Sequence, residues 1–136
     1  MKPGMEIGQI ATISFRVTED MYAQFEGNVV HPAYSTVSMV YHMEWASRQI
    51  ILPYLEEHEE GMGASVSVKH IAPTTAGTDV TVKAIITKLK KNLVITEVEA
   101  FNEKGLIGKG EVVQVILPKQ EIREKLANSK NVSTKM

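Results

Sequence analysis

The sequence contains no cysteine among its 136 residues. Disulfide bonds, zinc sites built on thiolates and a cysteine nucleophile are therefore excluded, and a reducing compartment is compatible with the composition. No apolar run approaches the roughly 20 residues of a membrane-spanning helix. The N-terminal stretch also lacks the uninterrupted apolar segment of a signal peptide. These absences predict a cytoplasmic globular protein without a membrane partner.

An excess of charge of one sign is also absent. The formal net charge is −1, with 23% charged and 43% hydrophobic residues. This balance gives no electrostatic reason to expect nucleic acid or an anionic membrane as a partner. The apolar share is that of an ordered domain, and a chain of this length buries roughly two-thirds of the surface that its unfolded form exposes. A single domain over residues 1–136 is expected.

A helical period followed by a strand period predicts the fold. We expect a first strand at 8–17, a loop with a short turn at 18–34, and a helix over 35–58 that Pro53 kinks or ends. From Gly63 onward, apolar residues recur at every second position, as in strands. The expected later elements are strands at 63–73, 78–91, 93–101 and 106–117, then a terminal helix and frayed tail over about 119–136.

Short turns between the last four strands favour antiparallel pairing. The sequence therefore predicts an α+β fold in which one long central helix packs against a curved antiparallel sheet of about five strands.

A carboxylate interrupts the apolar stripe of the expected helix. Glu44 lies in the middle of this stripe, so we expect it to face the sheet. A position at the edge of the stripe, where the carboxylate reaches water, is the alternative. A buried carboxylate is costly unless it is paired or hydrogen-bonded, so a partner is expected. The stripe consists of Val37, Val40, Tyr41, Ile51, Leu52 and Leu55.

The inward face of one strand continues to a histidine. Val66 and Val68 alternate with polar residues, and the same face reaches His70, where the imidazole would meet Glu44. A histidine on an apolar face can also be a satisfied core residue. Two titratable groups that face one interior favour a functional site instead. The other three histidines, His31, His42 and His58, have no spacing typical of a metal site, and His42 and His58 are expected at the surface.

A hydroxyl at the start of the helix is the third candidate. Thr36 precedes Glu44 by about two helical turns, which puts both residues on roughly one side of the helix. Its simplest role is that of an N-cap, which Ser35 could equally fill. A helix N-terminus also offers free N–H groups and the positive end of the dipole, which would polarise a carbonyl. Thr36 could thus serve as a cap and as a catalytic hydroxyl.

The spacing of these residues and several local motifs resemble a known family. The motifs are MKPGMEIG at 1–8, MEWA at 43–46, PYLE at 53–56, GASVSVKHIAPTTAGTDVTVKA at 63–84 and IGKGEVVQVIL at 107–117. In these stretches the chain resembles the fluoroacetyl-CoA thioesterase-like branch of the hot-dog thioesterase superfamily, over nearly its whole length.

The resemblance implies an acyl-CoA thioesterase with Thr36, Glu44 and His70 as catalytic residues. It implies a homodimer, possibly paired into a dimer of dimers, with active sites where two protomers meet, and no cofactor besides the CoA of the substrate. Gly63 matches a glycine that lines the family's pocket. Tyr34 belongs to the stretch GNVVHPAY, which stands in place of the family's phenylalanine-rich lid.

Two departures leave the acyl group open. Val30 occupies a position of a lid aromatic, and Gln114 stands in place of an arginine. Another short-acyl or aryl thioester is therefore as compatible with the sequence as fluoroacetyl-CoA. Lys83 and Lys109 are among several lysines that could contact the CoA phosphates.

Two other functions remain open at this point. A hot-dog hydratase or dehydratase also uses a histidine with a carboxylate, but it leaves the acyl chain attached to CoA. A non-catalytic acyl-CoA-binding protein would hold the thioester without turnover. Release of free thiol from the thioester distinguishes a thioesterase from both.

Overall fold

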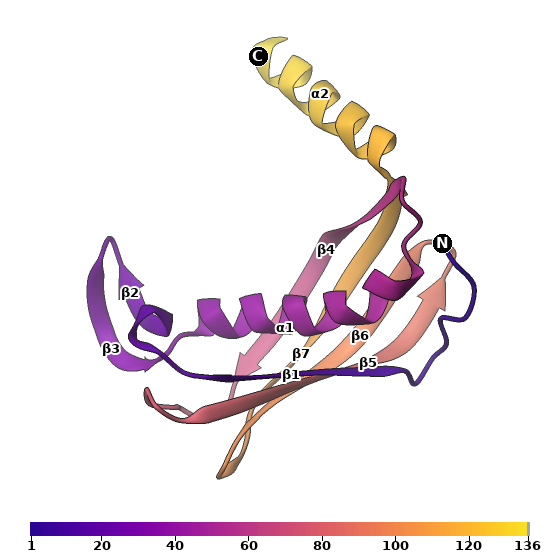
Figure 1. Ribbon diagram of the computed structural model, residues 1–136. Helices are drawn as coiled ribbons and strands as arrows, with labels where there is room; N and C mark the ends of the chain where they lie inside the picture. The colour runs from indigo at the N-terminus through magenta and orange to yellow at the C-terminus, as the bar shows by residue number, and fades with distance from the viewer. Residues whose placement is uncertain (136) are drawn as a thin grey trace.

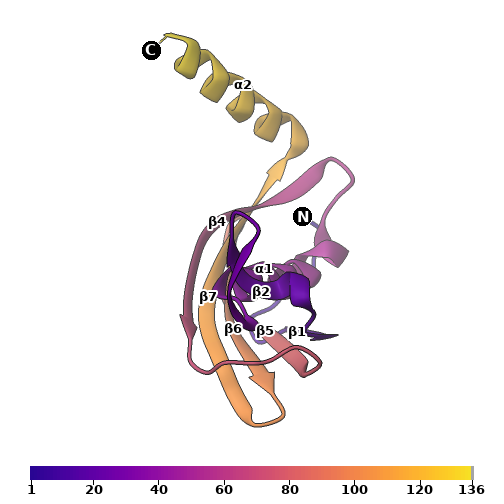
Figure 2. The same cartoon turned by 90° about the vertical axis from the view of Figure 1, so that its left-hand side faces the viewer.

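One helix lies across a five-stranded antiparallel sheet in the computed structural model (Figure 1), which describes the backbone of residues 1–135 and the side chains of residues 1–130. The helix α1 spans Thr36–Ile51 and ends in a 3₁₀ turn, η2, at Leu52–Tyr54. The sheet curves around α1 (Figure 2), so the predicted α+β hot-dog arrangement is confirmed. The strands run in the order β1 (Ile10–Arg16), β5 (Asp79–Lys90), β6 (Leu93–Asn102), β7 (Gly105–Pro118) and β4 (Glu59–His70).

A hairpin replaces the loop expected at residues 18–34. A 3₁₀ turn, η1 (Glu19–Met21), leads into β2 (Tyr22–Phe25), which pairs with β3 (Asn28–Tyr34) in a separate two-stranded sheet. The turn between the two strands has positive φ at Glu26 (52°) and Gly27 (80°), as a type I′ hairpin turn requires. Most of the hairpin is exposed, so the alternation of buried residues that reveals other strands is missing here.

The strand β4 is not the hairpin partner of β5, contrary to the order of short turns expected from the sequence. It pairs with β7 at one edge of the sheet, whereas β5 pairs with β1 near the other edge. The connection between them is held by backbone bonds: the Tyr34 N–H donates to Thr74 O (2.8 Å) and the Val17 N–H donates to Thr78 O (3.0 Å). This crossing carries the chain past the N-terminal end of α1.

The buried face of α1 differs from the predicted stripe. Met39, Met43 and Ala46 are fully buried against the sheet, whereas Val37 (74% exposed) and Tyr41 (64% exposed) face outward. Of the predicted stripe, Ile51 is fully buried and Val40 and Leu55 are half-buried, so the stripe was right only in part, because α1 carries apolar residues on two faces. Glu44 follows the outward face and is exposed, so its predicted orientation toward the core is also wrong.

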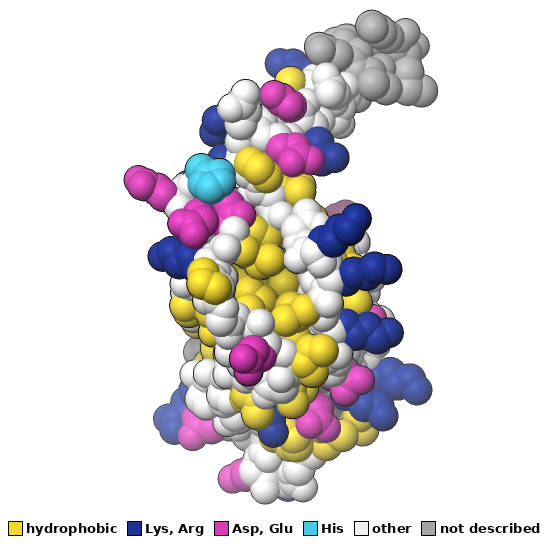
Figure 3. All heavy atoms as spheres, turned by 90° about the vertical axis from the view of Figure 1, so that its right-hand side faces the viewer, with side chains coloured by type: hydrophobic (Ala, Val, Ile, Leu, Met, Phe, Trp, Pro, Cys, Tyr) yellow, Lys and Arg dark blue, Asp and Glu magenta, His cyan; other side chains and the backbone are white. Residues whose placement is uncertain are grey.

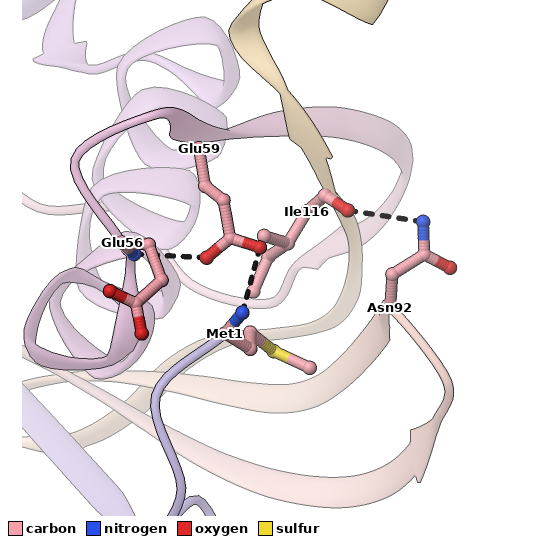
Figure 4. Close-up of polar contacts among 5 residues, drawn as sticks. All are labelled: Met1, Glu56, Glu59, Asn92 and Ile116. Atoms are coloured by element: carbon pink, nitrogen blue, oxygen red, sulfur yellow. Dashed lines mark hydrogen bonds and ion pairs between the residues drawn. The ribbon is translucent and has the colours of Figure 1, made fainter.

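The N-terminus fastens the start of β4, as Figure 4 shows. The amino group of Met1 pairs with Glu59 Oε2 (2.8 Å), and Glu59 Oε1 accepts the Glu56 N–H (2.9 Å). The hydrogen bond from the amino group holds the pKa of Glu59 below its usual range. Asn92 Nδ2 donates to Ile116 O (3.0 Å) in the same region. Figure 3 views this end of the molecule, where hydrophobic side chains gather centrally and basic side chains follow one edge.

The terminal helix α2 (Lys119–Lys135) leaves the body of the domain and extends away from the sheet (Figure 1). α2 begins where a terminal helix was predicted, but it continues as far as Lys135, through the stretch that was expected to fray; Met136 lies outside the described residues. Within the described part of the chain, no helix is both long and apolar enough to cross a membrane.

Candidate active site

Two of the three predicted catalytic residues lie together. A hydrogen bond of 2.9 Å joins Thr36 Oγ1 to His70 Nδ1. Thr36 is the first residue of α1, and His70 is the last residue of β4 and half-buried on its inward face. The crossing after His70 is what brings the end of β4 to the start of the helix. Thr36 and His70 are 34 positions apart in the chain, so the pair is a product of the fold.

Neighbouring hydroxyls at the helix start have separate partners. Ser35 is the N-cap: its Oγ accepts the Ser38 N–H at 3.0 Å. The hydroxyl of Thr36 is therefore not used as the cap and is available to His70. The first intrahelical bond runs from the Met39 N–H to Ser35 O, so the N–H groups of Thr36 and Val37 precede the helical ladder. A negative charge that forms beside Thr36 would meet these donors and the helix dipole.

The Thr36–His70 pair borders a cavity of about 470 Å³, here called the threonine cavity. It lies between the β2–β3 hairpin and the connection after β4, and it could hold the reacting part of a small ligand. Its lining residues also include Tyr34 and His31. The predicted substrate-binding position Tyr34 thus lies beside the pair.

A buried contact between Tyr34 and His42 lies next to this cavity. Tyr34 Oη and His42 Nδ1 are 2.7 Å apart, and the His42 ring stacks on Phe15 with centroids 3.7 Å apart. His42 is only 4% exposed, so its predicted surface position is wrong. Burial raises the pKa of Tyr34 and lowers the pKa of His42. Because the Tyr34 ring also meets the His70 ring edge-on, the contact fixes one wall of the site.

Glu44 belongs to a different cavity of the same chain. This second hollow, the glutamate cavity, measures about 410 Å³ and is bordered by Glu44, Gly63, Gln114 and Arg48, among others. Thr36 and His70 are not part of its lining. Thr36 and Glu44 are separated by about 12 Å along the helix axis. The predicted convergence of Glu44 and His70 in one interior is therefore wrong within one chain, although both border hollows on α1.

An ion pair lies at the border of the glutamate cavity. Arg48 Nη1 lies 2.9 Å from Glu60 Oε2, and this hydrogen bond holds the pKa of Glu60 below its usual range. The positive charge of Arg48 is thus already paired, and Glu44 is the carboxylate that borders the hollow.

Other predicted contacts lie elsewhere. Val30 is exposed on β3 and is part of neither lining. Lys83 and Lys109 border a hollow on the sheet surface with strand residues such as Glu97 and Glu99, away from both cavities.

Sequence reasoning missed the basic residue that borders each cavity. His31 borders the threonine cavity from β3, two positions before Ala33. Residues two positions apart on a strand face the same side, so this signal could be used only once β3 was known to be a strand. Arg48 borders the glutamate cavity one helical turn after Glu44, and this spacing of four residues was a usable signal.

Comparison with known proteins identifies the family of the chain. The family model described as FlK, fluoroacetyl-CoA-specific thioesterase, matches residues 17–120, which contain Thr36, Glu44 and His70. The chain belongs to the FlK family. The FlK family is a family of fluoroacetyl-CoA thioesterases, which are thioester hydrolases.

Individual relatives agree with the family assignment. The fluoroacetyl-CoA thioesterase of Streptantibioticus cattleyicolor is 28% identical over 132 residues, which cover 93% of this chain and 95% of the relative. A thioesterase superfamily member from Thermus thermophilus superposes with a TM-score of 0.91 at 42% identity, over 98% of this chain and 99% of that structure. The structure of the FlK thioesterase gives a TM-score of 0.85 at 27% identity, over 92% and 97% respectively.

Proposed function

We propose that this FlK-family protein hydrolyses a short or small acyl-CoA thioester to the free acid and CoA. The observation that carries the proposal is the hydrogen bond between Thr36 Oγ1 and His70 Nδ1 at the open N-terminus of α1, beside a cavity. A hydroxyl, a base and backbone donors are the three groups that acyl transfer needs.

In the proposed reaction the thioester carbonyl lies against the start of α1. The N–H groups of Thr36 and Val37 stabilise the developing oxyanion, and one such donor is typically worth about 3–4 kcal/mol in the transition state. His70 takes the proton of the attacking hydroxyl, which belongs to Thr36 or to a water that Thr36 holds. The carbon–sulfur bond then breaks, and the CoA sulfur leaves with the proton that His70 has taken. An attacking water gives the free acid directly, whereas attack by Thr36 leaves an acyl ester on its hydroxyl, which a water deprotonated by His70 then hydrolyses to the free acid.

We propose further that a second copy of the chain completes the site. Glu44 borders its own cavity, and an isolated chain leaves it apart from Thr36 and His70. The outward face of α1 exposes Val37, Tyr41 and Trp45, and β4 forms an edge of the sheet. A homodimer formed along this face and edge would bring the Glu44 of one copy toward the His70 of the other. Gly63, Gln114 and Tyr34, which border the two cavities, are the proposed substrate contacts.

The test is thiol release from a panel of acyl-CoA thioesters, from acetyl and fluoroacetyl to phenylacetyl and medium-chain. We expect turnover with at least one small acyl group and its loss in His70→Gln, which removes the base but keeps a polar side chain. Incubation with crotonyl-CoA distinguishes a hydratase from a thioesterase, because a hydratase adds water to the double bond without releasing free thiol. Tight binding of the panel without any thiol release would contradict the proposed function.

A further inference from the structure

Within the described chain, no lysine or arginine that borders either cavity is free to bind a phosphate. CoA carries a pyrophosphate and a 3′-phosphate, and proteins usually bind such groups with lysine or arginine side chains. The described lining of the threonine cavity includes neither residue type. Arg48 borders the glutamate cavity, but its guanidinium is paired with Glu60. Lys83 and Lys109 border a hollow on the sheet surface instead, so the CoA phosphates need another site.

The terminal helix α2 begins beside the glutamate cavity. Gly61 borders this cavity, and its partner on β7, Ile116, is followed three residues later by Lys119, the first residue of α2. The Lys119 N–H donates to His58 O at 2.7 Å, which holds the start of α2 against the start of β4. Figure 1 shows α2 extending away from the sheet at this end. A ligand that leaves the glutamate cavity at this end would therefore meet α2.

The charge of Lys119 acts at the border of this cavity. Hydrogen bonds from the Arg48 side chain and the Gly61 N–H hold the pKa of Glu60 below its usual range, and the charge of Lys119 adds to their effect. Lys119 itself has no ion pair with any residue whose side chain the structure describes. Lys119 thus provides a positive charge near the cavity that no described carboxylate pairs with.

The first turns of α2 separate their charges by sign. Lys119 and Arg123 are four residues apart, so they lie on one face of the helix, here called the basic face. The helical period turns Glu121 and Glu124 away from this face. Both basic side chains are exposed, and Arg123 also lacks an ion pair among the described side chains. The basic face is therefore open to an anion.

We propose that the basic face of α2 binds the phosphate groups of CoA while the thioester lies in the candidate site. The extended pantetheine arm separates the phosphates from the thioester, so the phosphates lie outside the cavity that holds the acyl group. A guanidinium and an ammonium group about one helical turn apart offer several N–H donors to phosphate oxygens. In the proposed homodimer this α2 belongs to the copy that supplies Glu44. The inference rests on the proposed function and assigns the CoA-binding segment for it.

Kinetics of a variant without the two charges test the basic face. Thiol release is measured with an acyl-CoA that the enzyme hydrolyses and with the N-acetylcysteamine thioester of the same acyl group, which carries no phosphate. In Lys119→Gln/Arg123→Gln we expect KM for acyl-CoA to rise about tenfold with kcat unchanged, because phosphate contacts are equal in the ground state and the transition state. kcat/KM for the phosphate-free thioester should keep its wild-type value. Both side chains are exposed, so the variant should melt as the wild type does.

Matched variants control for the loss of positive charge. Lys83→Gln/Lys109→Gln removes the same number of charges from the sheet surface and should keep the wild-type KM. Among single variants, Arg123→Gln should raise KM, whereas Lys125→Gln, on the opposite side of α2, should not. An equal increase of KM in the α2 and control variants would show only an effect of net charge and would overturn the inference. Wild-type kinetics in the α2 double variant would overturn it as well.

Binding without turnover separates this inference from the proposed function. Calorimetry gives the dissociation constants of CoA and of pantetheine, which lacks the phosphates. We expect the wild type to bind CoA more tightly, and the difference to shrink in Lys119→Gln/Arg123→Gln and at high ionic strength. If no acyl-CoA releases thiol but this difference remains and depends on the basic face, the proposed reaction fails and the inference stands. Equal affinities of the wild type for CoA and pantetheine overturn the inference, even if thioesters are hydrolysed.

Discussion

A substitution at Thr36 tests the role of its hydroxyl in catalysis without removing the N-cap of α1. Ser35 caps α1 through its Oγ, so Thr36→Val removes the group that contacts His70 and leaves the cap in place. We expect kcat/KM for thioester hydrolysis to fall roughly 10²–10⁴-fold, the usual range for a lost proton-transfer partner. Thr36→Ser, which keeps the hydroxyl, should retain most of the activity. Steady-state thiol release measures both, and a Thr36→Val enzyme with wild-type kinetics would exclude the hydroxyl.

His42 should make stability depend on pH. Burial lowers its pKa from the ordinary value of 6.5, so the folded protein disfavours the protonated ring. Below pH 6.5 the unfolded chain binds the proton more readily than the folded one, and the free energy of unfolding should therefore decrease as the pH falls from 6.5 toward the lowered pKa.

Urea unfolding between pH 5 and pH 8 measures this dependence. His42→Leu should flatten the curve in that window, while His58→Leu, at an exposed position, should keep the wild-type slope. Equal slopes in all three proteins would show that His42 does not contribute to the pH dependence of the free energy of unfolding.

At the scale of elements, local pattern predicted the strands better than their partners. The alternation that ends at Val66, Val68 and His70 placed the histidine on the inward face correctly. The pairing of β4 with β7 was not predictable, because no local pattern specifies a partner that follows about forty residues later in the chain. The face of α1 was misassigned because Val37 and Tyr41 are as apolar as the residues that form the core.

The contact between β4 and β7 depends on a position without a side chain. A Cβ at Gly110 would lie 2.1 Å from the Ser67 carbonyl oxygen, which is backbone and cannot move aside freely. We expect Gly110→Ala to lower the free energy of unfolding by about 1–3 kcal/mol, as overpacking usually does. Gly63→Ala, on the partner strand, meets only Glu44 Oε2 at 3.9 Å and should cost much less. Chemical denaturation compares the two, and equal destabilisation would contradict the packing argument.

At the scale of the whole molecule, the candidate site is divided. One chain provides Thr36 and His70 beside one cavity and Glu44 beside another. The residue types and their spacing were predictable from the sequence, because each lies at a recognisable place on a helix or strand. Their separation was not, because the expected stripe placed Glu44 in the core, whereas α1 turns it outward.

A divided site predicts complementation between two inactive variants. Glu44→Gln and His70→Gln chains, each inactive alone, are co-expressed with different tags and isolated as a heterodimer. If Glu44 acts on the site of the other copy, one of the two sites in this heterodimer is intact, and the activity should be about half that of the wild-type dimer. The reciprocal heterodimer, wild type with the Glu44→Gln/His70→Gln double variant, then has no intact site and should be inactive. The opposite result would be an inactive heterodimer of the two single variants and a reciprocal heterodimer with about half the wild-type activity. It would show that the three residues of each site belong to one chain, because the wild-type chain of the reciprocal heterodimer would then carry an intact site.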